Sequence, residues 1–256
     1  MNNDLDNLLE DWPHEPGHIK VRKIVGNDQK EKLQLRIDLG LIQMEVTGRP
    51  DGRRPHNAES LLTWHQKKAK RAEAKGENYS LSAEECGELQ QEGIQYYHRY
   101  ISFFQINDFT NVIRDTQRNL DLFSFVSHCT DNDEIRWSFE QFRPYVVMMN
   151  TRAKAAIRLE KKDFTGALKE IARGRAVIAE VLEDVDPAEL ATKSPEVGFL
   201  DEWAEEIGKK KPITRIEIMQ REMEKAIALE AYERAAELRD KIRAIDRKKA
   251  ARQSSL

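Results

Sequence analysis

Apolar and polar residues alternate near the start of the chain, and apolar residues recur at helical spacing through most of the remaining sequence. From Leu33 to Leu39, Leu and Ile occupy every second position, which is the pattern of a half-buried strand. After Gly40-Leu41 the apolar residues move to even positions, as a two-residue hairpin loop at that pair requires. Such a loop predicts that Ile37 lies opposite Met44. With residues 19–25 as a further strand, the pattern predicts a small antiparallel β-meander.

The middle of the chain contains an internal repeat. Ser82 and Glu85 form a capping box that opens a long helix. Asp108-Phe109-Thr110 restarts a helix, and the matching run Asp163-Phe164-Thr165 does so 55 positions later. Because Asp is a good N-cap residue, each run predicts a short turn between two long helices. The arrangement resembles tetratricopeptide-type (TPR) helical repeats, although its spacing exceeds their period of about 34 residues and their Trp-x-x-Leu-Gly opening is absent.

The C-terminal part carries two apolar stripes, separated by a break near residues 229–231. Thr214 and Glu217 predict a capping box at the start. The stripes at three- and four-residue steps predict two helices, and their apolar positions are Ile216, Met219, Met223 and Ile227, then Ala235, Leu238, Ile242 and Ile245. A hairpin of about 34 residues is too short to bury a self-sufficient core. It should therefore pack against a copy of itself, another hairpin or the rest of the chain.

The order of residues in this hairpin resembles a known motif. After Leu229-Glu230, the run Tyr-Glu-Arg-Ala-Ala-Glu-Leu-Arg-Asp fills residues 232–240. This run resembles the UVR motif of the UvrB excision-repair helicase, UvrC, Clp-family unfoldases and the activator of the bacterial protein-arginine kinase. The resemblance implies a bacterial protein with a protein-protein interaction element at this place.

The resemblance and the stripes together predict the partner-binding residues. Apolar faces would supply the contact and three charged residues would set its register. The predicted set is Met223, Ile227, Tyr232, Glu233, Ala235, Ala236, Leu238, Arg239, Asp240 and Ile242. On this hypothesis, Ala235→Glu combined with Ile242→Glu abolishes partner binding.

The predicted fold class is mainly α: a TPR-like helical hairpin array with a small N-terminal antiparallel β-meander and a C-terminal helical hairpin. The parts in chain order are an acidic N-terminal tail (1–18), the β-meander (19–56), the TPR-like body (57–184), a linker with a short amphipathic helix (185–212), the UVR hairpin (213–246) and a basic tail (247–256).

Composition narrows the function classes. Lys and Arg number 42 against 45 Asp and Glu, so the net charge of −3 gives no argument for nucleic acid. The two cysteines, Cys86 and Cys129, lack the spacing of a disulfide framework or a zinc site. The sequence shows neither a signal-peptide pattern nor an apolar run of about 18 residues. We therefore expect a cytoplasmic protein that does not enter a membrane.

The sequence also lacks motifs of catalysis. It has no Gly-rich phosphate loop, no His-Glu-x-x-His and no Gly-x-Ser-x-Gly, and its histidines lack ligand spacing. We therefore expect no enzyme activity, no cofactor, no metal and no catalytic residue. If the stacked hairpins form a concave groove, the residues expected to line it are Tyr97, Arg99, Arg114, Arg152 and Arg158.

These observations favour a protein-protein adaptor that recruits its partner through the C-terminal hairpin. The partner would be another UVR-containing protein or a Clp-type unfoldase, and self-association through the hairpin stays open. One alternative is an excision-repair accessory that contacts DNA through the cations of residues 67–75 and the basic tail. Another is a regulator of a Clp-type unfoldase or a protein kinase.

Overall fold

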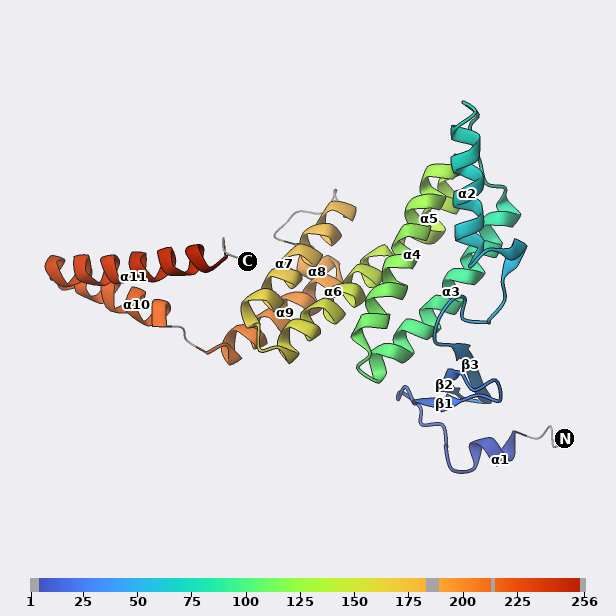
Figure 1. The fold of residues 1–256 in the computed structure, drawn as a ribbon, viewed down its shortest axis with the longest axis horizontal. Helices are drawn as coiled ribbons and strands as arrows, with labels where there is room; N and C mark the ends of the chain where they lie inside the picture. The colour runs from blue at the N-terminus through green and yellow to red at the C-terminus, as the bar shows by residue number, and fades with distance from the viewer. Residues whose placement is uncertain (1–4, 183–188, 213–214, 254–256) are drawn as a thin grey trace. The chain divides into compact units, whose positions relative to one another are not determined.

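The computed structural model describes residues 5–182, 189–212 and 215–253 (Figure 1). The chain divides into two compact units, residues 1–207 and residues 208–256. The first holds a small sheet and a helical body, and the second is a helical hairpin. The predicted fold class is thus confirmed in its outline, a mainly helical chain with an N-terminal sheet and a C-terminal hairpin.

The sheet has three antiparallel strands in the order β1-β2-β3. They are β1 (Val21–Val25), β2 (Glu31–Ile37) and β3 (Gly40–Glu45). The turn lies at Asp38-Leu39, because Ile37 pairs with Gly40 and Leu35 pairs with Ile42. The predicted pairing of Ile37 with Met44 is therefore wrong, since the turn comes two residues earlier than expected. A shift of two residues leaves each side chain on the face of the sheet that was predicted for it. Leu39, now in the turn, is exposed.

The acidic tail is held against this sheet. Its short helix α1 (Asp6–Leu9) precedes Trp12, whose ring lies 4.1 Å from the Arg22 guanidinium carbon. The Arg36 Nε donates to the Trp12 carbonyl at 2.9 Å. These two arginines tie the described part of the tail to β1 and β2.

Two long helical hairpins form the middle of the body, and the helices α4 and α6 pack against each other (Figure 1). Asp108 and Asp163 cap the second helix of each hairpin by accepting hydrogen bonds from the amides of Asn111 and Gly166. The internal repeat of a long helix, a short turn and a long helix is therefore present. The helices of the body are α2 (Leu61–Glu73), α3 (Ala83–Gln105), α4 (Phe109–Cys129), α5 (Asp133–Glu140), α6 (Arg143–Glu160), α7 (Phe164–Val181), α8 (Leu190–Lys193) and α9 (Pro195–Lys210), with a 3-10 turn at Pro55–Asn57.

Helix α9 packs on the body, in the segment where the sequence pattern predicted a linker with a short amphipathic helix. It is 16 residues long, and Val197, Leu200 and Ile207 are buried in the same core cluster as residues of the sheet and of α3, α4, α6 and α7. A second cluster joins α2 to α5 around Leu89, Val126 and other buried side chains. Residues 183–188, which include the first part of the predicted linker, lie outside the described residues.

A buried ionic network attaches the sheet and its following loop to the body. Arg99 donates to both carboxylate oxygens of Asp115, at 2.7 and 2.9 Å, and to the carbonyls of Glu45 and Gly48. Glu92 accepts from the Leu61 amide at 2.8 Å and pairs with Arg118. Since each of these charges has partners, the network can remain in the interior.

The second unit consists of α10 (Arg215–Ala228) and α11 (Tyr232–Gln253). Helix α11 extends into the predicted basic tail. Thr214 of the predicted capping box lies outside the described residues, as do residues 254–256. Among the helices that the structure describes, none combines the length and the apolar character needed to span a membrane.

Candidate partner-binding site

The turn of the C-terminal hairpin is set by backbone geometry at Glu230. This residue has a φ of 57°, a left-handed conformation that is common one residue past the end of a helix. The Ala231 amide donates to the Ala226 carbonyl at 2.8 Å, and the Glu230 amide donates to the Ile227 carbonyl at 3.0 Å. The chain therefore reverses over residues 229–231, where the apolar stripe loses its phase.

The interior of the hairpin is a small apolar cluster. Met219, Leu238 and Ile242 are buried against one another, with Met223 and Ile245 partly buried beside them. Ala226 and Ala235 are also buried, and small side chains allow two helices to approach closely. This cluster holds α10 and α11 together.

The burial corrects part of the predicted partner-binding set. Ala235, Leu238 and Ile242 lie between the two helices of the hairpin, so a partner cannot reach them without opening it. Met223 and Ala236 are only half-buried. The pair of substitutions Ala235→Glu and Ile242→Glu would therefore unfold the hairpin rather than remove a surface contact.

The exposed apolar residues of the hairpin gather at its turn. Ile227, Leu229 and Tyr232 are 49%, 79% and 66% exposed, and they lie within six consecutive positions that span the end of α10 and the start of α11. We call these three residues the tip surface. Ile218 is a further exposed apolar residue of α10. Leu229 was absent from the predicted set. The sequence could have indicated it, because Leu229 is an apolar residue placed in the turn itself.

The three charged residues of the predicted set are exposed. Glu233 follows Tyr232 in the first turn of α11. Arg239 and Asp240 pair with each other at 3.1 Å. Such an exposed pair contributes little to stability, about 0 to 1 kcal/mol, so both side chains can rearrange toward a partner.

The two units differ in charge. Residues 208–256 contain 14 Lys and Arg against 8 Asp and Glu, whereas acidic residues are in excess in residues 1–207. The small net charge of the whole chain hides this difference. The C-terminal unit is therefore basic and would be attracted to acidic surfaces.

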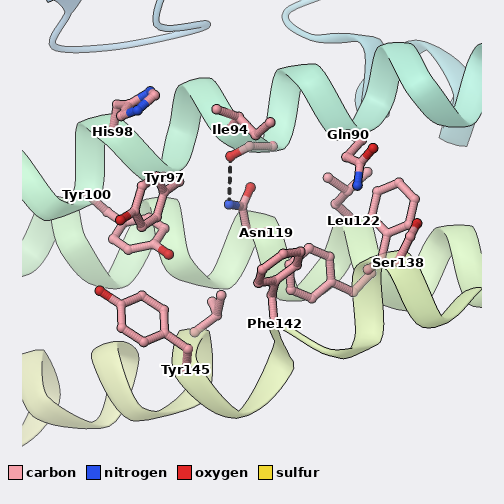
Figure 2. Close-up of a pocket in the computed structure, with 14 residues that line it drawn as sticks. Gln90, Ile94, Tyr97, His98, Tyr100, Asn119, Leu122, Ser138, Phe142 and Tyr145 are labelled. Atoms are coloured by element: carbon pink, nitrogen blue, oxygen red, sulfur yellow. Dashed lines mark hydrogen bonds between the residues drawn. The ribbon is translucent and has the colours of Figure 1, made fainter.

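The five residues predicted to line one groove of the body lie in different surroundings. Arg99 is fully buried in its pair with Asp115. Arg152 lies between the rings of Phe104 and Phe199, at 4.4 and 4.5 Å. Arg114 pairs with Asp115, and Arg158 pairs with Asp163 and Glu170. Of the predicted set, Tyr97 alone lines the apolar pocket of Figure 2.

Both cysteines are packed side chains of the second core cluster. Burial raises the pKa of the Cys86 thiol and that of the Cys129 thiol. A raised pKa keeps each sulfur in its neutral, weakly nucleophilic form. In the part of the chain that the structure describes, no group of three His, Cys, Asp or Glu side chains is placed to hold a metal ion.

Comparison with protein families identifies the hairpin. The family described as the UvrB/uvrC motif (UVR) matches residues 214–248, which covers α10 and most of α11. The predicted UVR motif is therefore confirmed. No curated protein and no solved structure matches the chain.

Proposed function

We propose that this chain is a non-enzymatic adaptor, in which a TPR-like helical body carries a C-terminal UVR hairpin that recruits a protein partner in the cytoplasm. The observation that supports the proposal most directly is the tip surface. A confirmed UVR hairpin exposes Ile227, Leu229 and Tyr232 together at its turn.

Burial of these side chains supplies the free energy of recruitment. Covering one large apolar side chain is worth about 1.5 to 3 kcal/mol relative to leaving it exposed. The internal cluster of the hairpin is small, so a second apolar face packed on the tip would stabilise the hairpin as well as the complex. The complementary surface is a helical hairpin of the same kind, on another UVR-containing protein, on a Clp-type unfoldase or on a second copy of this chain.

The test uses the full chain as bait for a native bacterial lysate and compares three proteins. The first is the wild type, and the second carries Leu229→Ser and Tyr232→Ser, which change exposed side chains only. The third carries Leu39→Ser, a matched exposed leucine at the turn of the sheet. We expect the tip variant to lose the partner and the Leu39→Ser control to retain it, with unchanged helicity by circular dichroism in both.

Sedimentation equilibrium of the same proteins separates the two kinds of partner. Self-association predicts a wild-type dimer that the tip variant dissociates, and a foreign partner predicts monomers throughout. Capture of the same proteins by wild type and tip variant would contradict the proposal. The identity of a captured unfoldase or kinase would decide whether the adaptor acts as its regulator.

A second candidate is an excision-repair accessory with DNA contact, and the basic C-terminal unit is the observation that favours it. Binding of duplex DNA to this unit would release counterions, so the affinity would fall steeply as salt rises. Fluorescence anisotropy with a labelled duplex at about 50 and 200 mM salt measures this dependence. The adaptor proposal predicts no binding at the higher concentration.

A further inference from the structure

The body contains a pocket of about 470 Å³ that the proposed adaptor role does not use. Helices α3, α4, α5 and α6 surround it, and Figure 2 shows their side chains converging on it. Ligand pockets have volumes of about 300 to 1,000 Å³ and are lined by apolar and aromatic groups. The size of this pocket therefore suits a small molecule.

The walls of the pocket are apolar and carry no formal charge. Phe123, Phe139 and Phe142 contribute rings, and Ile94 at the mouth is partly exposed. Among the described residues that line it, none is Asp, Glu, Lys or Arg. The one basic side chain is His98, and burial lowers its pKa. Because a buried ion without a counter-charge is costly, the pocket selects against charged ligands.

One end of the pocket carries three phenol groups. The ring of Tyr97 lies 5.5 Å from that of Tyr100 and 6.3 Å from that of Tyr145, and Figure 2 shows the three close together between α3 and α6. Burial raises the pKa of Tyr100 and of Tyr145, so both hydroxyls remain protonated donors. The polar character of the pocket is thus concentrated at one end.

Tyr100 is the decisive residue of this group. Its side chain is 1% exposed and lines the pocket. Across the described residues, no hydrogen bond engages its hydroxyl. Its oxygen is not among the described buried side-chain atoms that lack a partner, so the pocket leaves it accessible. A donor that faces a pocket and has no acceptor within the described protein is free to donate to an acceptor on a ligand.

We infer that this pocket binds a small uncharged molecule with an apolar, ring-sized body and one hydrogen-bond acceptor directed at the Tyr100 hydroxyl. The apolar body would lie against the phenylalanine rings, and the acceptor would lie at the tyrosine end. The tip surface of the C-terminal hairpin takes no part in this binding.

Three matched probes test the inference by NMR titration of the full chain. Acetophenone has a ring and a carbonyl acceptor, ethylbenzene has the same ring without an acceptor, and benzoate carries a negative charge. We expect acetophenone to bind about fivefold more tightly than ethylbenzene, since one neutral hydrogen bond contributes about 1 kcal/mol. Benzoate should be the weakest, and the shifted resonances should belong to residues that line the pocket.

Variants separate the hydrogen bond from the apolar contact. Tyr100→Phe removes only the hydroxyl, so acetophenone should bind it no more tightly than ethylbenzene while ethylbenzene binding stays unchanged. Phe142→Ala removes a wall residue that is 51% exposed and should weaken both neutral probes. Trp137→Ala is the matched control, because Trp137 is a 65% exposed aromatic of α5 that does not line the pocket.

The inference fails if none of the probes shifts pocket resonances, if benzoate binds as tightly as acetophenone, or if Tyr100→Phe preserves the advantage of acetophenone. Equal losses of affinity in Phe142→Ala and Trp137→Ala would also overturn it, because they would indicate nonspecific association. A protein in which Leu229→Ser and Tyr232→Ser abolish recruitment should bind the probes as the wild type does. The two proposals can therefore fail separately.

Discussion

The helical hairpins of the body and the C-terminal hairpin have the same turn, yet they differ in what covers them. In the turns after α3, α6 and α10, the residues Asn107, Lys162 and Glu230 have φ values of 58°, 58° and 57°. In each turn the next amide donates to a carbonyl five residues earlier, at 2.9, 2.8 and 2.8 Å. An aromatic residue then opens the second helix.

The surroundings of that aromatic residue distinguish the two units. Phe109 and Phe164 pack partly buried against the main core cluster, whereas Tyr232 is exposed. The body turns also have an aspartate cap, and the C-terminal hairpin has Ala231 at the corresponding position. The same local chemistry thus builds a hairpin whose aromatic residue is covered by a core in the body and a hairpin whose aromatic residue stays exposed in the C-terminal unit.

The largest predicted difference concerns ion pairs. Arg99→Met leaves Asp115 with only the partly exposed Arg114 as its ionic partner, and loss of the buried partner should destabilise the body by about 3 to 5 kcal/mol. Arg234→Met breaks an exposed pair with Glu237 at 3.0 Å, and it should cost less than about 1 kcal/mol. Urea unfolding followed by tryptophan fluorescence measures the first effect, because all four tryptophans lie in residues 1–207. Amide hydrogen exchange in α11 measures the second, and equal effects would contradict the comparison.

The next effect lies inside the C-terminal hairpin. Leu238→Ala removes the most buried side chain of its small cluster, and such truncations cost about 2 to 5 kcal/mol. Amide hydrogen exchange of the full chain should show lost protection in α10 and α11 with unchanged protection in the body. Leu229→Ala at the exposed turn is the control and should leave both units protected. Loss of protection in α3 to α7 would mean that the two units fold together.

Substitutions at the helix N-caps test whether the aspartate caps account for the local difference between the turns. Asp163→Ala removes a side chain that accepts from the Gly166 amide at 2.8 Å, and it should destabilise the body by about 1 kcal/mol. Ala231→Asp installs the missing cap and should stabilise the hairpin by about 0.5 to 1 kcal/mol. Amide hydrogen exchange should show reduced protection of α7 in Asp163→Ala and increased protection of α11 in Ala231→Asp. An unchanged α11 would show that its first turn is limited by something other than the cap.

The smallest predicted change in stability concerns the residues with a left-handed backbone conformation in the turns. Lys162→Gly relieves the strain of a side chain at positive φ and should stabilise the α6–α7 hairpin by about 0.5 kcal/mol, after the greater freedom of glycine in the unfolded chain is subtracted. Asn107→Gly should give less, because asparagine already tolerates this conformation. Thermal unfolding of the two variants compares them, and a larger gain at Asn107 would argue against this account.

The sequence by itself determined the features that depend on neighbouring residues. The Asp108 and Asp163 caps depend on residues within a few positions, and the UVR motif is an order of residues in the sequence itself, so both could be predicted without the fold. The alternation in β2 did not predict its burial, because Lys32, Leu33, Gln34 and Leu35 are all buried. The mainly helical fold class follows from such local signals, because periodic apolar residues define helices wherever they later pack.

Tertiary structure alone decided which faces were covered. Apolar periodicity did not separate the inward Leu238 from the outward Ile227, since both belong to the same stripe pattern. Nor did it show that Arg99 would be buried against Asp115 or that the β2–β3 turn would lie at Asp38-Leu39. Burial is a property of surfaces brought together from distant parts of the chain, so the site residues could be assigned only once those surfaces were in place.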